Sequence, residues 1–122
     1  MKNNIIRLSL AAAIFLISTA TKAQVVTQIL QVNGDCGMCK KRIETACYGL
    51  KGLKNADWND EKRTLTVSFD STKTSAEAIL QRVAAVGYDN EKYKADDKAY
   101  KKLPSCCQYD RSRLTTAAVK SN

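Results

Sequence analysis

The sequence predicts an α+β fold in which two helices cover one face of an antiparallel sheet. Apolar and polar residues alternate roughly in the stretch 25–32 and cleanly in the stretch 63–69, which is the period of a half-buried strand. Apolar residues recur at helical spacing in two other stretches, one after Cys39 and one after Thr74. Helical and extended segments therefore follow one another in the order β-α-β-β-α-β, which is typical of a split βαβ unit.

The first strand is expected over residues 25–32 ("VVTQILQV"), which is rich in β-branched residues. The first helix is expected over residues 39–50. Its apolar residues Ile43, Cys47 and Leu50 are spaced at i, i+4 and i+7, so that they lie on one stripe of the helix. This stripe is the face that we expect to be buried.

Two strands and a second helix are expected next. The strands are "ADWND" at 56–60 and "RTLTVSF" at 63–69. "TSAE" then forms a capping box, in which the Thr74 side chain accepts a hydrogen bond from an exposed helical N–H and Glu77 reaches back. Gly87 supplies a left-handed stop at the end of this helix.

A weaker last strand is expected over residues 91–96 ("EKYKAD") and is followed by an extension, residues 97–122. The extension has a short helical stretch, then Pro104 and the adjacent cysteines Cys106 and Cys107. Its polar end is expected to be disordered.

The first 23 residues are typical of a secretory signal. Lys2 and Arg7 precede an apolar run over residues 8–17, and "TKA" then offers small residues to a signal peptidase. The run is shorter than the roughly 20 residues that span a bilayer. We expect cleavage after Ala23, a periplasmic or secreted mature chain, and no membrane insertion of that chain. Residues 24–96 then form the domain.

Composition restricts the chemistry. The signal contains three of the 20 basic residues and no acidic residue, so the net charge falls from +8 to +5 on cleavage. The chain has no aromatic-basic motif, and we expect no nucleic-acid partner. Histidine is absent, which excludes histidine ligands and histidine general bases, and we expect no enzyme. Five cysteines remain, and sulfur ligands favour soft ions.

The strongest motif is "CGMC", in which Cys36 lies in the strand-to-helix loop and Cys39 in the first helical turn. The N-terminus of a helix carries partial positive charge, which favours a thiolate, and Lys40 and its two basic neighbours add to it. The pair can hold a soft cation such as Cu(I) or Hg(II). It can also be a redox dithiol or one part of a disulfide framework.

Further motifs flank the dithiol: "VNG" at 32–34, "RIE" at 42–44, "AC-x-x-L-x-GL" at 46–53, "VSFD" at 67–70, "TS" at 74–75 and "GY" at 87–88. Together with "CGMC" they resemble the heavy-metal-associated domain, the ferredoxin-like module of copper chaperones, metal-transport ATPase N-termini and the periplasmic mercuric-ion-binding protein. The resemblance covers residues 25–96. A thioredoxin-like oxidoreductase fits less well, because that fold needs a cis-proline facing the dithiol and the only proline is Pro104.

The resemblance implies that Cys36 and Cys39 bind the metal, with Cu(I) and Hg(II) ahead of Zn(II) and Cd(II). It implies that Tyr88 lies over the metal loop, and we expect Tyr88, Met38 and Lys40 to surround the ligands without binding the ion. The expected partners are the metal ion and a membrane metal transporter or another thiol-bearing metal-binding protein.

The sequence departs from the family before Cys36. Gly34 and Asp35 stand where the family has Gly-Met-Thr, so the methionine that normally packs beneath the metal loop is missing. Cys47 replaces a family leucine on the buried stripe of the first helix, and we expect it to pack as a small hydrophobic residue.

Cys106 and Cys107 lie outside the resemblance. They can pair with each other or with another chain, or they can return to the metal loop and contribute to an S₄ site or to disulfides. The last strand is expected to run away from the metal loop, and residues 96–105 can span roughly 15 to 25 Å. Because that length can recross a small sheet, we predict that the extension returns and that at least one of the two thiols reaches the ion.

The function predicted from the sequence is that of an exported carrier or scavenger of a soft metal ion. The ion would pass between thiolates by stepwise ligand exchange. The alternative is a thiol-disulfide redox or disulfide-linked interaction module in which the metal site is idle.

Overall fold

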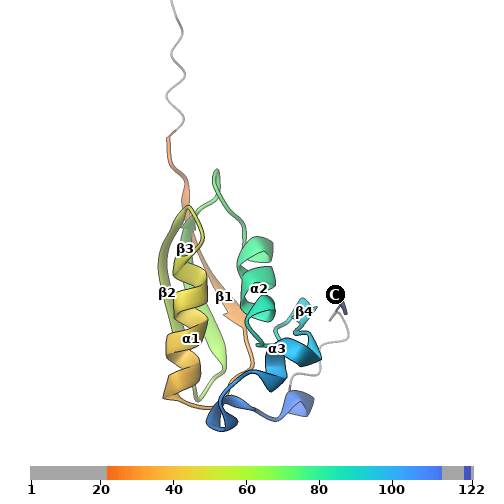
Figure 1. Cartoon of the computed structure of the whole chain (residues 1–122). Helices are drawn as coiled ribbons and strands as arrows, with labels where there is room; N and C mark the ends of the chain where they lie inside the picture. Colours follow the sequence, from red (N-terminus) through yellow and green to blue (C-terminus); the bar gives the residue numbers. More distant parts are fainter. Residues whose placement is uncertain (1–21, 114–119, 122) are drawn as a thin grey trace, which may run out of the picture.

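The computed structural model describes residues 22–113 and 120–121 (Figure 1). The predicted signal lies outside these residues except for Lys22 and Ala23, as does most of the end expected to be disordered. The domain elements are β1 (Val25–Gln31), α1 (Gly37–Tyr48), β2 (Leu53–Asn59), β3 (Thr64–Asp70), α2 (Ala76–Ala85) and β4 (Tyr93–Lys94). They are followed by α3 (Asp97–Lys101), the 3₁₀ turns η1 (Ser105–Cys107) and η2 (Arg111–Arg113), and β5 (Lys120–Ser121).

The predicted α+β class is confirmed. The main sheet has the strand order β1-β3-β2 with antiparallel neighbours, and Figure 1 shows α1 and α2 together on one face of it. Alternate side chains of the strands meet the helices in one core, which is why the period-2 pattern identified the strands. This core includes Leu30, Val32, Ala56, Trp58, Leu65, Val67 and Phe69 from the sheet side and Ile43, Cys47, Ile79, Leu80 and Val83 from the helices.

The last strand of the predicted unit is wrong in length and in pairing. β4 has two residues and pairs with β5. Among the described residues, this part of the chain pairs with the end of β1 only through the isolated antiparallel bridge between Val32 and Asn90. The Asn90 side chain accepts hydrogen bonds from the backbone N–H groups of Lys92 and Tyr93 and donates one to the carbonyl of Leu80. These local bonds fold the chain into a turn where a strand would have continued along β1.

The second helix begins one residue later than the capping box predicts. Ser75, not Thr74, is the N-cap, and its hydroxyl accepts from the N–H of Ala78 at 3.1 Å. The Glu77 carboxylate accepts a hydrogen bond from the hydroxyl of Tyr93. The predicted stop is confirmed, because Gly87 has φ +109° and its N–H donates to the carbonyl of Ala84.

The extension packs against the domain at the end where α1 starts (Figure 1). Leu103, Cys107 and Tyr109 are buried in the same core as the helices and strands. α3 approaches the end of α2 closely, since a Cβ on Gly87 would lie 2.9 Å from the carbonyl oxygen of Ala99. No described helix has the length and apolar character needed to cross a membrane.

Candidate metal centre

The first turn of α1 brings two thiols together. Cys36 is the N-cap residue, with an extended backbone, and Cys39 lies three residues later in the first turn, fully buried. Their Sγ atoms are 3.7 Å apart. Hydrogen bonds from the backbone N–H groups of Cys39 and Met38 lower the pKa of the Cys36 thiol, which favours its thiolate. The expected positions of both cysteines in loop and helix are confirmed.

Trp58 supports the loop before these thiols, in a way that the sequence analysis did not predict. The indole is buried beneath the loop and its Nε1 donates to the carbonyl of Val32 at 3.0 Å. A Cβ on Gly34 would lie 2.7 Å from Cζ2 of the ring, so the loop backbone rests directly on the indole. The Nε of Arg63 donates a hydrogen bond to the carbonyl of Gly34 at 3.2 Å. Although the loop lacks the family's methionine, an aromatic side chain fills the space beneath it.

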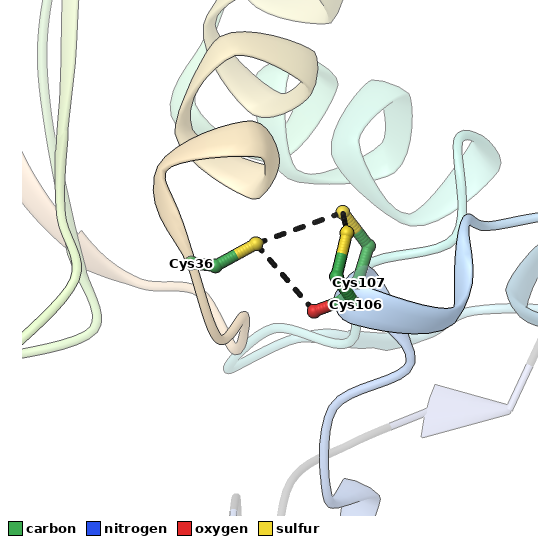
Figure 2. A group of neighbouring side chains, drawn as sticks. All are labelled: Cys36, Cys106 and Cys107. Carbon is green, nitrogen blue, oxygen red and sulfur yellow. Dashed lines mark hydrogen bonds between the residues drawn. The ribbon is translucent and has the colours of Figure 1, made fainter.

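Two more thiols reach this loop from the extension. The Sγ of Cys107 lies 4.0 Å from the Sγ of Cys36 and 3.9 Å from that of Cys106. The Cys36 thiol also donates to the carbonyl of Cys106 at 3.5 Å. The sulfur atoms of these three residues all lie within 4.8 Å of one another, and Figure 2 shows them converging from α1 and η1.

The turn η1 makes this convergence possible for adjacent residues. Its tight winding separates consecutive side chains by about a third of a turn, and the N–H of Cys107 closes it on the carbonyl of Pro104 at 2.8 Å. Cys107 points inward and is buried, whereas Cys106 is exposed. Burial raises the pKa of the Cys107 thiol to about 12. The return of the extension to the dithiol is thus seen in the structure, and a role of its thiols as ligands stays a prediction.

Tyr88 lies on the buried side of the thiols. Its ring is fully buried and stacks on Tyr109, with 5.8 Å between the ring centroids. Burial raises the pKa of its hydroxyl above the usual range, with smaller contributions from the neighbouring Cys39 and Cys107. Among the described residues this hydroxyl has no hydrogen-bond partner. A polar atom is therefore buried against the thiol cluster, at the position where Tyr88 was expected.

Met38 and Lys40 differ in where the structure places them. The Cys106 thiol donates to the Met38 sulfur at 3.7 Å, and the Met38 side chain is half exposed. The ammonium of Lys40 instead binds Asp57, Glu44 and the carbonyl of Trp58. These partners lie on α1 and β2, and none is a thiol. The structure therefore shows no direct contact between Lys40 and the dithiol that it was expected to support.

Cys47 lies apart from the cluster. It is fully buried on the inner face of α1, as predicted, and burial raises the pKa of its thiol to about 12. A neutral buried thiol packs as a small apolar group. Cys47 is therefore part of the core.

Polar contacts fix the extension to the domain, and sequence reasoning missed them. The Arg111 guanidinium binds both carboxylate oxygens of the buried Asp89, at 2.8 and 2.9 Å, and lies 4.8 Å from the centre of the Tyr100 ring. The Tyr109 hydroxyl accepts from the N–H of Asp89 and donates to the carbonyl of Gly87, both at 2.7 Å.

The metal loop itself is joined to the extension. The side-chain amide of the buried Asn33 donates to the carbonyl of Asp110 at 3.0 Å, and the N–H of Asn33 donates to the carbonyl of Asp89 at 2.9 Å. The segment before Cys36, the segment after Tyr88 and the extension are thereby held as one unit.

Four thiols around the open end of a helix, under a ferredoxin-like arrangement of helices and strands, define a small metal-binding domain. The family model described as "Heavy-metal-associated domain" matches residues 29–89. The chain belongs to this family.

Relatives with assigned roles support the class. The chain is 33% identical over 63 residues to "Copper chaperone CopZ" of Staphylococcus aureus, covering 51% of this chain and 93% of the relative. It is 41% identical over 63 residues to "Zinc-transporting ATPase" of Synechocystis, where the match covers 51% of this chain and only 9% of the ATPase. Oxidised MerP of Ralstonia metallidurans has a similar structure, with a TM-score of 0.52 and 29% identity, covering 55% of this chain and 94% of MerP.

Proposed function

We propose that this protein binds a soft metal ion outside the cytoplasm, with Cu(I) and Hg(II) preferred over Zn(II) and Cd(II), and carries it between thiol-bearing partners. The observation that carries the proposal is the pair of sulfurs 3.7 Å apart at the open end of α1. Because the chain has no histidine, thiolates are the ligands that the site provides, and thiolates bind soft ions preferentially. The copper, zinc and MerP proteins that the chain is similar to support a metal cargo.

Transfer would proceed by ligand exchange. A thiolate of the partner binds the ion first, one thiolate of the pair then leaves, and the second exchange completes the transfer. A membrane metal transporter or another thiol-bearing metal-binding protein is the proposed partner. Cys36, at the start of the helix, is only partly buried, which leaves an ion bound there open to such an approach.

Titration of the purified protein with Cu(I) and with Hg(II), under reducing conditions against a competing chelator, tests the proposal. We expect one tightly held ion, and we expect the double variant Cys36→Ser/Cys39→Ser to lose it. Cys47→Ala is the matched control, because it removes a thiol that lies outside the cluster. Equal affinity in the double variant and the wild type would refute the assignment.

The alternative of a redox or disulfide-linked module predicts a different result. The four thiols would then be isolated as disulfides, and after reduction the protein would bind no ion. Export is tested separately by fractionating cells that express the full chain and a chain lacking residues 1–23. We expect only the full chain outside the cytoplasm, and equal distribution would contradict the proposed location.

A further inference from the structure

We propose that the extension completes the metal centre, so that the ion is held by three thiolates, those of Cys36, Cys106 and Cys107. This inference rests on the proposed function, since it concerns the same ion. The ion would then have three sulfur ligands and not the two of a simple dithiolate site. Cys39 lies next to this set, with its sulfur 3.7 Å from that of Cys36.

The spacing of the sulfurs favours three ligands, Cys36, Cys106 and Cys107, over two. With zinc's metal–sulfur distance of about 2.3 Å as the measure, a linear dithiolate needs sulfurs about 4.6 Å apart, a trigonal site about 4.0 Å and a tetrahedral site about 3.8 Å. The observed separations are 4.0 Å for Cys36–Cys107, 3.9 Å for Cys106–Cys107 and 3.7 Å for Cys36–Cys39. Each of these is shorter than a linear pair requires, and the third separation of the proposed set, between the sulfurs of Cys36 and Cys106, is at most 4.8 Å.

The extension thiols stand in place before any ion binds. Cys107 is buried and sits in the turn η1, between Leu103 and Tyr109, which are also buried. Downstream, the Asn33 bond to Asp110 and the Arg111 pair with Asp89 fix the chain. A site whose ligands are already positioned costs little ordering entropy on binding.

Further soft and polar groups lie around the three thiols. The Met38 thioether is 3.7 Å from the sulfur of Cys106, on the exposed side. The hydroxyl of Tyr88, without a partner among the described residues, is buried on the opposite side beside Cys39 and Cys107. The hydroxyl can donate to a thiolate once a metal ion has replaced the thiol protons. The three thiols therefore lie between a soft thioether and a hydroxyl that can stabilise a thiolate, which is the environment expected of metal ligands.

Cys36 belongs both to the pair with Cys39 and to the set with Cys106 and Cys107. The ion can therefore move from the pair to the set without leaving Cys36. An ion on Cys36 and Cys39 binds Cys107 as that thiol loses its proton to solvent, and Cys106 follows in the same way. The bond to Cys39 then breaks and Cys39 takes up a proton, while the oxidation state of the ion does not change. Since three bonds must be exchanged in turn, release should be slower than from a dithiolate.

X-ray absorption of the protein loaded with one equivalent of Cu(I) tests the inference. We expect three or more sulfur neighbours in the wild type and two in Cys106→Ser/Cys107→Ser. We also expect the double variant to bind Cu(I) at least about tenfold more weakly, because even the loss of a group that only supports a ligand costs 10- to 100-fold. Cys47→Ala, which removes a thiol outside the cluster, should keep the wild-type sulfur count.

The outcomes separate the two proposals. If the wild type binds no Cu(I), the proposed function fails. If it binds Cu(I) with two sulfur neighbours that are unchanged in the double variant, only the role of the extension is refuted. Because Cys107 is buried, its replacement could unfold the extension, so the exposed Cys106→Ser is measured as well. A sulfur count that falls in this variant while its circular dichroism is unchanged supports the inference, and an unchanged count contradicts it.

Discussion

Arg111 is the residue whose removal should detach the extension from the domain. Its guanidinium binds both oxygens of Asp89, the carbonyl of Ala95 and the carboxylate of Asp97. Arg111→Met keeps an unbranched apolar side chain but removes every one of these bonds. Among the described residues, the Asp89 carboxylate, whose side chain is 6% exposed, then keeps only one hydrogen-bond donor, the N–H of Ala95 at 2.7 Å. A buried charge is left without its counter-ion.

The cost follows from that charge. Breaking a buried ion pair by removing one partner costs about 3 to 5 kcal/mol. The Arg111 side chain is itself 19% exposed, so water can reach part of the pair and we expect the lower end, about 3 kcal/mol. Local opening of the extension should then become roughly a hundredfold more frequent.

Two assays measure the effect. Urea denaturation of the metal-free protein gives the free energy of unfolding. Alkylation followed by peptide mass spectrometry gives the labelling rates of two buried thiols, Cys107 in the extension and Cys47 in the core. If the extension opens locally, labelling of Cys107 should accelerate by roughly a hundredfold while that of Cys47 changes much less.

Arg113→Met is the matched control. Arg113 lies in the same 3₁₀ turn, but its pairs with Asp35 at 3.4 Å and Asp110 at 4.0 Å are solvent-exposed. Exposed pairs contribute about 0 to 1 kcal/mol, so this variant should label and unfold nearly as the wild type does. If Arg111→Met cost no more than Arg113→Met, the buried pair would not be what holds the extension.

Three further predictions concern the core, the metal loop and pH. Cys47→Ala should lower the free energy of unfolding by about 1 kcal/mol or more, through a lost buried contact, with nearly unchanged metal affinity; a large affinity loss at constant stability would place this thiol in the site. Gly34→Ala drives a Cβ to within 2.7 Å of the Trp58 ring and should cost about 1 to 3 kcal/mol in urea denaturation, whereas Gly37→Ala, with open space around its Cβ, should cost nothing. Because the folded state raises the pKa of Cys47 from 9.0 to about 12, its contribution is full below pH 9 and is lost as the pH rises toward 12. Between pH 8 and pH 10 the wild type should therefore lose about 1 kcal/mol more than Cys47→Ala does, and equal losses would contradict this.

The parts of the fold that were predicted correctly are those with a strong local pattern. Strands β1 and β3 were located to within one residue, because β3 alternates between buried and half-buried side chains almost throughout and β1 is rich in β-branched residues. β2 was found only as 56–60, since the residues before Ala56 do not alternate, although the strand begins at Leu53. The dithiol was located because C-x-x-C at a strand-to-helix junction needs no long-range partner to bring its sulfurs together.

The parts that were missed depend on partners far away in the sequence. Thr74 and Ser75 are both good caps, and in the structure Ser75 takes the position. The sequence predicts Trp58 only as a strand residue, and nothing local shows that its ring lies beneath the loop at Gly34, more than twenty residues earlier. Asp89 and Arg111 likewise look like two surface charges until the fold has buried them.

The return of the extension shows how a correct position can be predicted by a wrong route. The sequence predicts a last strand that runs away from the dithiol, with residues 96–105 long enough to bring the chain back. In the structure the Asn90 side chain turns the chain at once, and α3 packs beside Gly87. The described part of the extension from α3 to η2 therefore lies at the dithiol end, and no recrossing is needed to bring Cys106 and Cys107 there. A turn that keeps Cys106 and Cys107 near Cys36 along a short path leaves the extension little freedom. Because of that restriction, the two thiols are held in fixed positions near Cys36. The stability of the extension and the coordination of the ion should therefore change together in Arg111→Met.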